Sequence, residues 1–430
     1  MASTVQSRSS LNTRPTTPTG GSSPTYDAIC IGFGPAQIAT AIANRESRKP
    51  SNILFLEKKT AFSWHPSTHL PRTRMENAFI YDLATTRNPR SGFSYTNYLL
   101  AQNRLIEFAN SDRMNPLREE FEDYLRWCAD QFKEEVQYGC EVVGVVTERD
   151  STAVQGWSVA FRDTQGKTQM LRTKNILAPS SRPKEETSQP LTSVNFQAGQ
   201  RIVSFEDYLS QRNNLREARE PRIDIAVVGS GQQAIEIVDD LLTCPRLGNV
   251  TVVTENEALS PLRILGDEAA PPPPRLCSIW AKPSSSAQSG ISASSELIQN
   301  IYLRAYEKQL ASKGQYALRV VIGKDTAGPT SKANIIIAEK ANTHMSASGL
   351  FHGLDALVLG CQQKGESLEE VQFKRGAVTN GCSMWLLSAH SEGGRSLAKD
   401  VAVRAGEVVR GLAEARETGR EGSVVINARM

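Results

Sequence analysis

Two short glycine-rich segments could hold the phosphate groups of dinucleotides, because each follows directly on an apolar run. In the first, Gly32, Gly34 and Pro35 follow the run 26–31. The first glycine allows a tight turn, and the second lets the backbone approach a pyrophosphate at the N-terminus of the following helix. Glu57 ends the next apolar run, 25 residues after Gly32, and can accept hydrogen bonds from a ribose. One such segment also fits an ordinary turn in an α/β sheet, so alone it is weak support.

The second segment has the same layout about two hundred residues later. A glycine–serine–glycine turn precedes two glutamines, and an acidic residue follows the next apolar run, 26 residues after the first glycine: Gly229, Ser230, Gly231, Gln232, Gln233 and Glu255. Two units in one chain are far more specific than one. They are typical of flavoproteins in which one site binds FAD and the other a nicotinamide dinucleotide.

The spacing of apolar residues along the rest of the chain predicts an α/β fold that positions these glycine turns. Helices are predicted at about 37–44, 118–132, 229–242, 297–313 and 397–413. Strands are predicted at 26–31, 52–57, several places within 135–178, 223–228, 250–254, 317–322, 333–338 and 354–359. Residues 179–222 are predicted to be a polar connector, 268–295 a Pro/Ser-rich loop, and 1–25 a disordered tail.

Composition limits the classes of function. The 430 residues exceed the roughly 250–300 that one core can serve, so two or three domains are expected. A net charge of +3, from 49 basic and 46 acidic residues, predicts neither a nucleic-acid nor a membrane-surface partner. The seven cysteines show no metal-ligand spacing, which argues against a zinc site and a disulfide framework. The chain is expected to be a soluble protein of a reducing compartment, the cytoplasm.

Several segments resemble the fungal ornithine N-monooxygenases, flavin-dependent N-hydroxylating enzymes whose relatives act on lysine. The segments are 32–36, 62–65, 82–91 and 121–128. The resemblance implies a two-dinucleotide-binding-domain flavoprotein, in which an NADPH domain at 186–345 is inserted into an FAD domain formed by 26–185 and 346–430. It also implies that NADPH reduces FAD, that the flavin binds O₂ as a C4a-hydroperoxide, and that a neutral primary amine attacks the distal oxygen.

The glycine-rich units and the resemblance together assign site residues to three groups. The FAD contacts are Gly32, Gly34, Pro35, Glu57, Lys58, Phe62, Trp64, His65, Glu76 and Val142, and the nicotinamide contacts are Gly229, Ser230, Gly231, Gln232 and Gln233. Tyr81 is the expected substrate contact. By residue type alone, an aromatic–His pair such as Trp64 and His65 is more often core packing than a flavin contact. No residue is assigned as catalytic.

Departures from the family pattern bear on the substrate. Glu76 stands where the ornithine enzymes have Gln, and Tyr81 stands where they have the Lys that holds ornithine's carboxylate. A tyrosine brings no charge to such a carboxylate, which predicts an amine other than free ornithine, in secondary metabolism. Three alternatives stay open: a siderophore ornithine hydroxylase, a flavoprotein that oxidises a hydroxylamine or a carbon, and a non-catalytic relative. A homo-oligomer is also left open.

Glu255→Arg tests the choice of nicotinamide. A carboxylate at this strand end accepts hydrogen bonds from an unmodified ribose and repels a 2′-phosphate. The resemblance favours NADPH, and Arg246 or Arg263 could neutralise Glu255, so we expect NADPH to be used with weak discrimination against NADH. The variant should raise the ratio of flavin-reduction rates with NADPH and NADH by about a decade, or ~1.4 kcal/mol. An unchanged ratio would mean that the carboxylate faces solvent.

Overall fold

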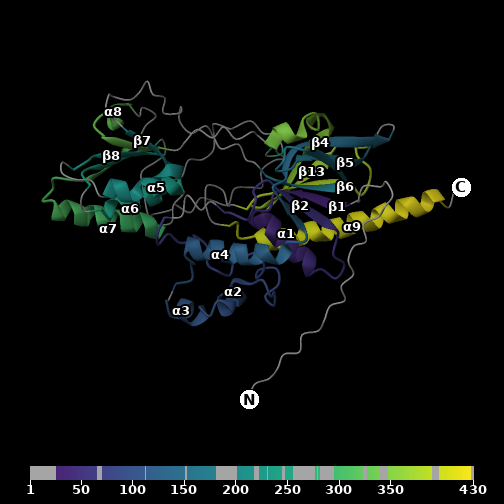
Figure 1. The fold of residues 1–430 in the computed structure, drawn as a ribbon, viewed down its shortest axis with the longest axis horizontal. Helices are drawn as coiled ribbons and strands as arrows, with labels where there is room; N and C mark the ends of the chain where they lie inside the picture. The colour runs from purple at the N-terminus through teal and green to yellow at the C-terminus, as the bar shows by residue number, and fades with distance from the viewer. Residues whose placement is uncertain are drawn as a thin grey trace, which may run out of the picture.

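Two β-sheets, each with its own helices, make up the two units of the computed structural model (Figure 1). The structure describes residues 26–64, 70–111, 113–150, 153–180, 201–216, 222–229, 231–244, 247–254, 277, 279–280, 295–322, 327–338, 347–389 and 397–427. The larger unit combines segments from both ends of the chain, and the smaller unit is formed by the middle.

The larger sheet has the strand order β12-β13-β14-β6-β1-β2-β3, and β5 joins β4 to β6. Its strands are β1 (Tyr26–Ile31), β2 (Ile53–Glu57), β3 (Val136–Tyr138), β4 (Glu141–Asp150), β5 (Ala153–Arg162), β6 (Thr168–Pro179), β12 (Val358–Lys364), β13 (Leu368–Phe373) and β14 (Ser383–Leu387). β1 runs parallel to β2 on one side and to β6 on the other. β14 pairs parallel with β6 and so brings the chain's last third into this sheet.

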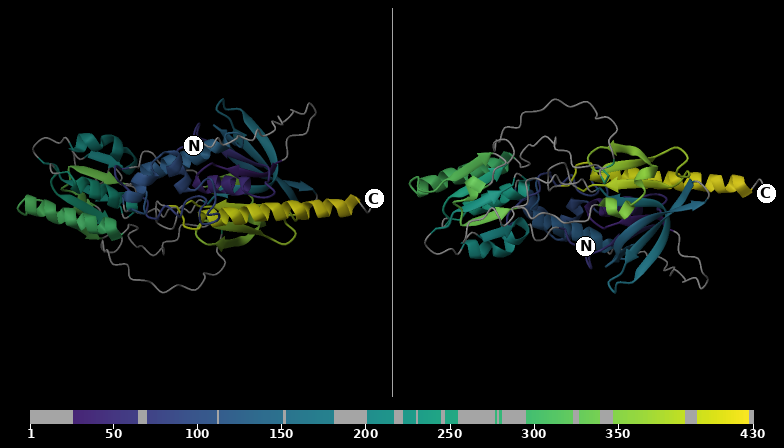
Figure 2. Two further views of the ribbon diagram at one scale, coloured as in Figure 1. Left: turned by 90° about the horizontal axis from the view of Figure 1, so that it is seen from below. Right: turned by 90° about the horizontal axis from the view of Figure 1, so that it is seen from above.

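Side chains of β1 alternate between two hydrophobic cores on opposite faces of the larger sheet. Ala28 and Cys30 lie in the core on one face, and Ile29 and Ile31 lie in the core on the other. Helices contribute to the first core and partly wrap it: α1 (Pro35–Arg45), α2 (Tyr95–Ala101), α3 (Leu105–Asn110), α4 (Arg118–Ala129) and α9 (Val401–Asn427). α9 packs along α1 and extends beyond the sheet (Figure 2). The strands β4–β6 and the 3₁₀ turn 347–351 contribute to the second core.

The smaller sheet is parallel throughout, in the order β10-β9-β8-β11-β7. Its elements are β7 (Arg201–Ser204), α5 (Phe205–Arg216), β8 (Ile225–Val228), α6 (Gln232–Leu242), β9 (Val250–Thr254), α7 (Ser295–Ala311), β10 (Leu318–Ile322), α8 (Ala327–Thr330) and β11 (Ile335–Ala338). A parallel sheet needs cover on its faces, since its strands are apolar on both sides. α6 supplies part of that cover and packs against α7.

Three predicted elements differ from the structure. Within the described part of the supposed connector 179–222, β7 and α5 form, because Phe205, Tyr208 and Leu215 are buried in the small-sheet core despite their polar surroundings. The apolar run 354–359 is a 3₁₀ turn at 355–357 rather than one strand, and β12 begins only at Val358. The last helix begins at Val401, not 397, and ends at Asn427, not 413.

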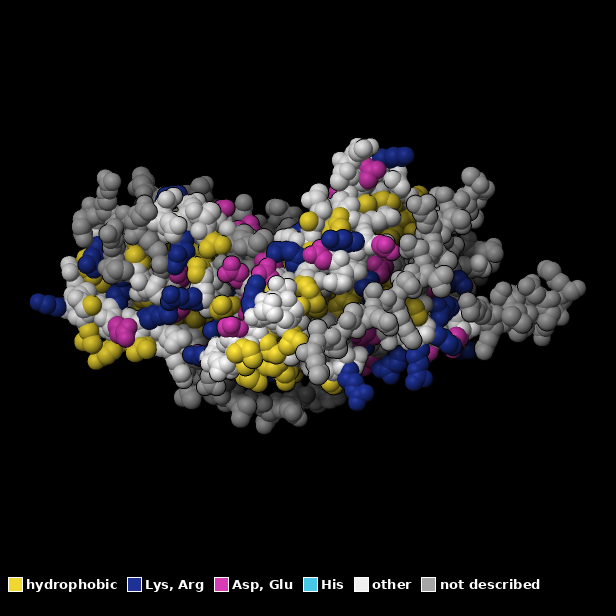
Figure 3. Space-filling model, turned by 60° about the horizontal axis from the view of Figure 1, so that its bottom comes forward, with side chains coloured by type: hydrophobic (Ala, Val, Ile, Leu, Met, Phe, Trp, Pro, Cys, Tyr) yellow, Lys and Arg dark blue, Asp and Glu magenta, His cyan; other side chains and the backbone are white. Residues whose placement is uncertain are grey.

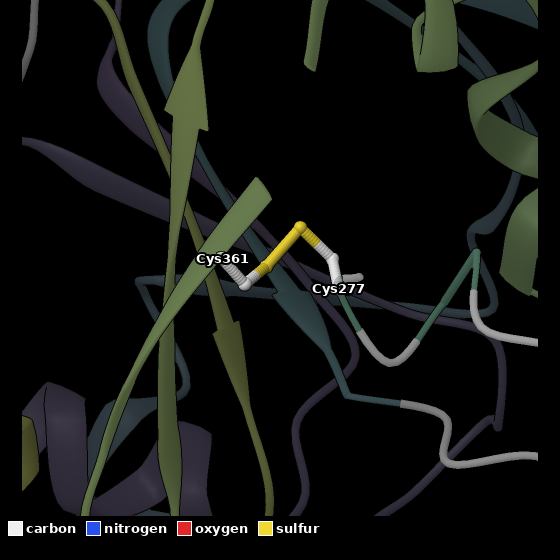
Figure 4. The surroundings of a disulfide bond; sticks show 2 residues. All are labelled: Cys277 and Cys361. Carbon is white, nitrogen blue, oxygen red and sulfur yellow. A yellow bond between two sulfur atoms is a disulfide. The ribbon is translucent and has the colours of Figure 1, made fainter. Parts of the chain in front are cut away.

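A disulfide joins Cys277 to Cys361, which corrects the expectation drawn from the cysteine spacing (Figure 4). The cysteines are 84 residues apart, and their Cα atoms lie 4.8 Å apart. Local spacing gave no sign of the pair because tertiary folding brings Cys277 onto β12. Cys277 and Ile279 lie in the second core of the larger sheet, so a segment between β9 and α7 packs on the larger unit.

The segment 82–91, which carried much of the resemblance, is held by hydrogen bonds to two carboxylates, Asp82 and Glu46. We call this arrangement the clasp. The carboxylate of Asp82, almost fully buried, accepts hydrogen bonds from the backbone N–H groups of Ala84, Thr85 and Tyr95. Glu46, which caps the end of α1, accepts hydrogen bonds from Arg87, Asn88 and Ser91. The motif therefore has a structural role that sequence comparison alone did not indicate.

Leu100 of α2, Ile106 of α3 and Met114, which follows α3, are large hydrophobic residues with exposed side chains. These side chains are 58%, 70% and 58% exposed. Figure 3 shows hydrophobic side chains gathered on one face of the molecule. Patches of this kind can be covered by partners, and a homo-oligomer stays a prediction. None of the helices in the described ranges combines the length and apolar character needed to cross a membrane.

Glu46→Gln should weaken the clasp at neutral pH. Burial raises the pKa of Glu46, but the hydrogen bonds from Ser91, Asn88 and Arg87 outweigh it, so the pKa lies below its usual value. A lowered native pKa stabilises the fold above the unfolded value of about 4.3 and loses that effect as the pH falls through the native value. We expect a loss of about 1.5–3 kcal/mol in unfolding free energy at pH 7, and a smaller loss at pH 3.

Urea unfolding at both pH values measures this difference. Glu417→Gln is the matched control, because Glu417 pairs with Lys49 on the surface, where both side chains are more than half exposed. Such pairs contribute little. A Glu46→Gln effect as small as the control's, or one that grows at low pH, would contradict the account.

Candidate functional site

The first glycine-rich turn lies where β1 ends and α1 begins. Gly32 has a φ of +84°, a left-handed conformation that glycine adopts without strain. Its N–H donates to the carbonyl of Leu56, 2.8 Å away, which fixes the turn against β2. Gly34 is the N-cap of α1, no side-chain hydrogen bond caps this helix, and Pro35 stands in its first turn. The N-terminal N–H groups of α1 are therefore available to an anion.

Glu57 lies beside this turn, at the end of β2. Its Oε2 accepts a 2.7 Å hydrogen bond from the N–H of Phe33, and its Oε1 accepts one from the N–H of Lys59 at 2.9 Å. Each carboxylate oxygen has two lone pairs, so both retain capacity for a ribose hydroxyl. The structure thus brings the predicted glycines and the predicted acid together at one strand edge.

The second glycine-rich turn repeats this geometry at the end of β8. The N–H of Gly229 donates to Val253 of β9 at 3.0 Å, and its φ is +149°. Gly231 is the N-cap of α6, again with no side-chain cap. A Cβ placed on Gly231 would meet no atom within 4 Å. The helix N-terminus is therefore open to a ligand, as at the first turn.

The two glutamines after this turn make contacts within the protein. Gln232, almost fully buried, donates from Nε2 to Glu236 at 2.9 Å, and Gln233 donates to the carbonyl of Phe205 at 3.3 Å. The side-chain nitrogens of both glutamines are thus bonded within the protein, and their assignment as nicotinamide contacts stays a prediction. The remaining predicted residues His65 and Ser230, together with Glu255, lie outside the described residues.

The predicted flavin-side residues lie in the larger unit. Trp64 is 4% exposed, and its ring lies 6.2 Å from that of Phe121. The backbone N–H of Trp64 donates to the carboxylate of Glu122 at 3.4 Å. Phe62 packs partly buried against the same core. Glu76 is half-buried, and its carbonyl accepts a hydrogen bond from Asn115.

Two further predicted contacts flank Glu57. Lys58 is exposed directly after it, and Val142 is buried in β4. β4 lies close by because the N–H of Cys140 donates to the carbonyl of Glu57.

Tyr81, the predicted substrate contact, has a neighbour that the sequence did not reveal. The ammonium of Lys399 lies 5.5 Å from the centre of the Tyr81 ring. The two come together because Asn77 donates to the carbonyl of Leu397 at 2.6 Å, which holds the segment before α9 against 77–81. Lys399 is exposed. No pattern in the sequence around Lys399 marked it as a neighbour of Tyr81.

Among the described residues, no three His, Cys, Asp or Glu side chains are grouped so that they could hold a metal ion. A cleft of about 310 Å³ is lined by Arg74, Arg104, Glu107, Phe108, Ser111, Leu117 and Glu120. None of these residues is among the predicted cofactor or substrate contacts. The predicted dinucleotide contacts lie instead around the two glycine turns at the starts of α1 and α6.

The family model of L-lysine 6-monooxygenase/L-ornithine 5-monooxygenase matches residues 24–335. The chain is 37% identical to an L-ornithine N(5)-monooxygenase of Ajellomyces capsulatus over 239 residues, 55% of this chain and 50% of that protein. It is 36% identical to one from Emericella nidulans over 253 residues, 55% of this chain and 49% of that protein. The chain thus spans about half the length of the curated relatives it matches.

Solved structures share the fold over most of the chain. The ornithine N-hydroxylase KtzI of Kutzneria sp. 744, solved with reduced FAD, NADP⁺ and L-ornithine, superposes with a TM-score of 0.67 at 22% identity, covering 91% of this chain and all of that one. The ornithine hydroxylase PvdA of Pseudomonas aeruginosa gives 0.66 at 22%, with the same coverage. The predicted α/β fold with two Rossmann-type units is confirmed. On the family match over most of its length, the chain belongs to the L-lysine 6-monooxygenase/L-ornithine 5-monooxygenase family.

Proposed function

We propose that this protein is an FAD- and NADPH-dependent monooxygenase that hydroxylates the nitrogen of a primary amine. One observation carries the proposal: each of the two sheets ends a strand in a glycine turn that leads into a helix without a side-chain cap. The relatives are L-ornithine N(5)-monooxygenases, and a solved neighbour holds FAD and NADP⁺. Both support the assignment of one dinucleotide to each turn.

The first turn fits the ADP half of FAD. A Cβ on Gly34 would lie 3.2 Å from Oε1 of Gln37 and meet no other atom within 4 Å, apart from its immediate chain neighbours, so the backbone here is open to a pyrophosphate. In this proposal Gly32, Gly34 and Pro35 hold the phosphates, Glu57 the ribose, and Trp64 and Glu76 lie near the flavin ring. The segments 26–185 and 346–430 would then form the FAD domain.

The second turn fits a nicotinamide dinucleotide. In this proposal Gly229 and Gly231 give the pyrophosphate access to the N-terminus of α6, within an NADPH domain at 186–345. Bound FAD, reduced by NADPH, would supply the chemistry that activates O₂. The chain's own residues would bind both dinucleotides, orient the amine and exclude water. The amine must lose its proton from a pKa near ~10.4, so its pocket must desolvate it or offer an acceptor.

The substrate that we propose is an amine of an amino acid or a peptide-like intermediate, rather than free ornithine. Tyr81 has no charge for a carboxylate. Lys399 brings a positive charge nearby, but from an exposed position, where an ion pair contributes only about 0–1 kcal/mol. The siderophore ornithine hydroxylase remains the second candidate, because the relatives carry that activity by name.

We further infer that the amine and O₂ are the small-molecule partners of this reaction. Fungal secondary metabolism in the cytoplasm would be its setting, although the Cys277–Cys361 disulfide removes the cysteine spacing as support for a reducing compartment. The near balance of 49 basic and 46 acidic residues supports neither nucleic acid nor a membrane surface as a further partner.

Gly34→Val should yield protein without flavin. The native φ of Gly34 is −86°, which valine can adopt, so the fold should survive while the side chain blocks the pyrophosphate. The measurement is the ratio of visible flavin absorbance to protein absorbance after purification. Gly92→Val is the matched control, because Gly92 is exposed and a Cβ there meets nothing within 4 Å. Full flavin occupancy in Gly34→Val would refute the assignment.

Product analysis with a panel of amines tests the function itself. With NADPH and O₂, we expect a hydroxylamine product from a modified or peptide-linked amine. Turnover of free ornithine should be roughly one to two decades less efficient than by a siderophore hydroxylase, matching a lost charge-assisted hydrogen bond of about 1.5–3 kcal/mol. Equal ornithine efficiency, assayed side by side, would establish the second candidate instead. No hydroxylated amine from any panel member would reject N-hydroxylation.

A further inference from the structure

A buried ion pair connects the two units. Nη2 of Arg118, at the start of α4, lies 3.0 Å from Oε1 of Glu236 on α6, and the two side chains are 2% and 3% exposed. Among the ion pairs of the described residues it is the one in which both side chains are this deeply buried. Burying two charges is costly unless the partners are held in place and compensate each other.

On the side of the larger unit, Arg118 belongs to a fixed corner. Its backbone N–H donates to Thr73 at 2.9 Å, and its Nε donates to the carbonyl of Arg74 at 3.2 Å. Thr73 in turn donates from its N–H and Oγ1 to the carbonyl of Leu70. The Leu70 side chain packs in the core of the smaller sheet. One corner of the larger unit therefore contributes both an apolar contact and a charge to the smaller unit.

Hydrogen bonds also connect this corner to Glu76, which we propose lies near the flavin ring. The N–H of Met75 donates to the carbonyl of Pro116 at 2.8 Å. The amide of Asn115 donates to the carbonyls of Met75 and Glu76, both at 2.9 Å. The backbone that carries Glu76 is thus fastened to the segment that leads into Arg118.

On the side of the smaller unit, Glu236 connects to the second glycine turn. Its Oε1 also accepts the 2.9 Å hydrogen bond from Nε2 of Gln232. Gln232 is the first residue of α6 and follows Gly231 directly. A continuous series of contacts therefore runs from the Glu76 segment through Arg118 and Glu236 to the turn proposed for the nicotinamide dinucleotide.

We propose that Arg118 and Glu236 are positioning residues that fix the orientation of the nicotinamide unit on the flavin unit. The consequence for hydride transfer rests on the function proposed above. Reacting atoms must approach to about 3–3.5 Å, so a small tilt between units is enough to slow transfer. Removing one charge leaves the other buried without compensation, and the units can relieve that cost by separating and admitting water.

Glu236→Gln tests this role with two readouts. Small-angle X-ray scattering of the full-length protein should show a larger radius of gyration than wild type. The first-order rate of anaerobic flavin reduction at saturating NADPH should fall tenfold or more, while flavin occupancy is retained and the NADPH Kd changes less than threefold. The double variant Arg118→Gln/Glu236→Gln removes both charges of the pair. On a logarithmic scale, it should recover at least half of the fall in flavin-reduction rate seen in Glu236→Gln.

Two matched controls separate orientation from general damage. Asp239→Asn breaks the 2.5 Å pair between Asp239, which is on α6 like Glu236, and Arg304 of α7; both helices belong to the smaller unit. Glu296→Gln breaks a second pair between the units, with Arg113, whose members are 65% and 53% exposed. Both variants should keep the scattering curve and the saturating reduction rate of wild type.

The outcomes distinguish this proposal from the function on which it rests. If wild type is not reduced by NADPH but Glu236→Gln still expands, the function fails and the orienting role of the pair stands. If wild type is reduced and Glu236→Gln matches it in saturating rate, the positioning role is wrong, whatever the scattering shows. An unchanged scattering curve for Glu236→Gln also overturns it, as does an equal loss of rate in either control.

Discussion

Unpaired backbone N–H groups at the first turn of a helix are the constraint on which this structure depends. Both sheets deliver such a turn at the carboxyl end of a central strand, through Gly32–Gly34 and Gly229–Gly231. Only a residue without a Cβ lets a phosphate reach these groups while the chain reverses so tightly. The order of strands around β1 and β8, and the apolar cores beneath them, keep the two turns in place.

Local patterns sufficed to predict the turns and the strands that flank them. The glycines, the position of Glu57 and the apolar run of β1 are all features of short segments. Interactions between residues that are close in the sequence leave such patterns. Contacts between distant segments were not visible. The Cys277–Cys361 bond, the Arg118–Glu236 pair and the approach of Lys399 to Tyr81 each join residues at least 84 apart. Nothing in the spacing of either partner marks such contacts.

The segment 82–91, on which much of the family resemblance rests, has a structural role. Its residues hold the loop 82–91 and the end of α1 in place through the carboxylates of Asp82 and Glu46. The resemblance in this segment therefore reflects the fold rather than a binding site. Tyr81, directly before this segment, differs from the family in charge. If Tyr81 contacts the substrate as we propose, the chain retains the scaffold of the family while a substrate contact differs, which is why fold and cofactors are easier to infer than the amine.

The central claim is that two dinucleotides meet across the two units, and anaerobic reduction measures that most directly. The full-length protein would be purified, its visible flavin absorbance recorded, and NADPH added without oxygen. Our account predicts bound flavin that loses its visible absorbance on addition of one equivalent of NADPH. Protein that carries no flavin after reconstitution with FAD, or flavin that keeps its absorbance in excess NADPH and NADH, would contradict it.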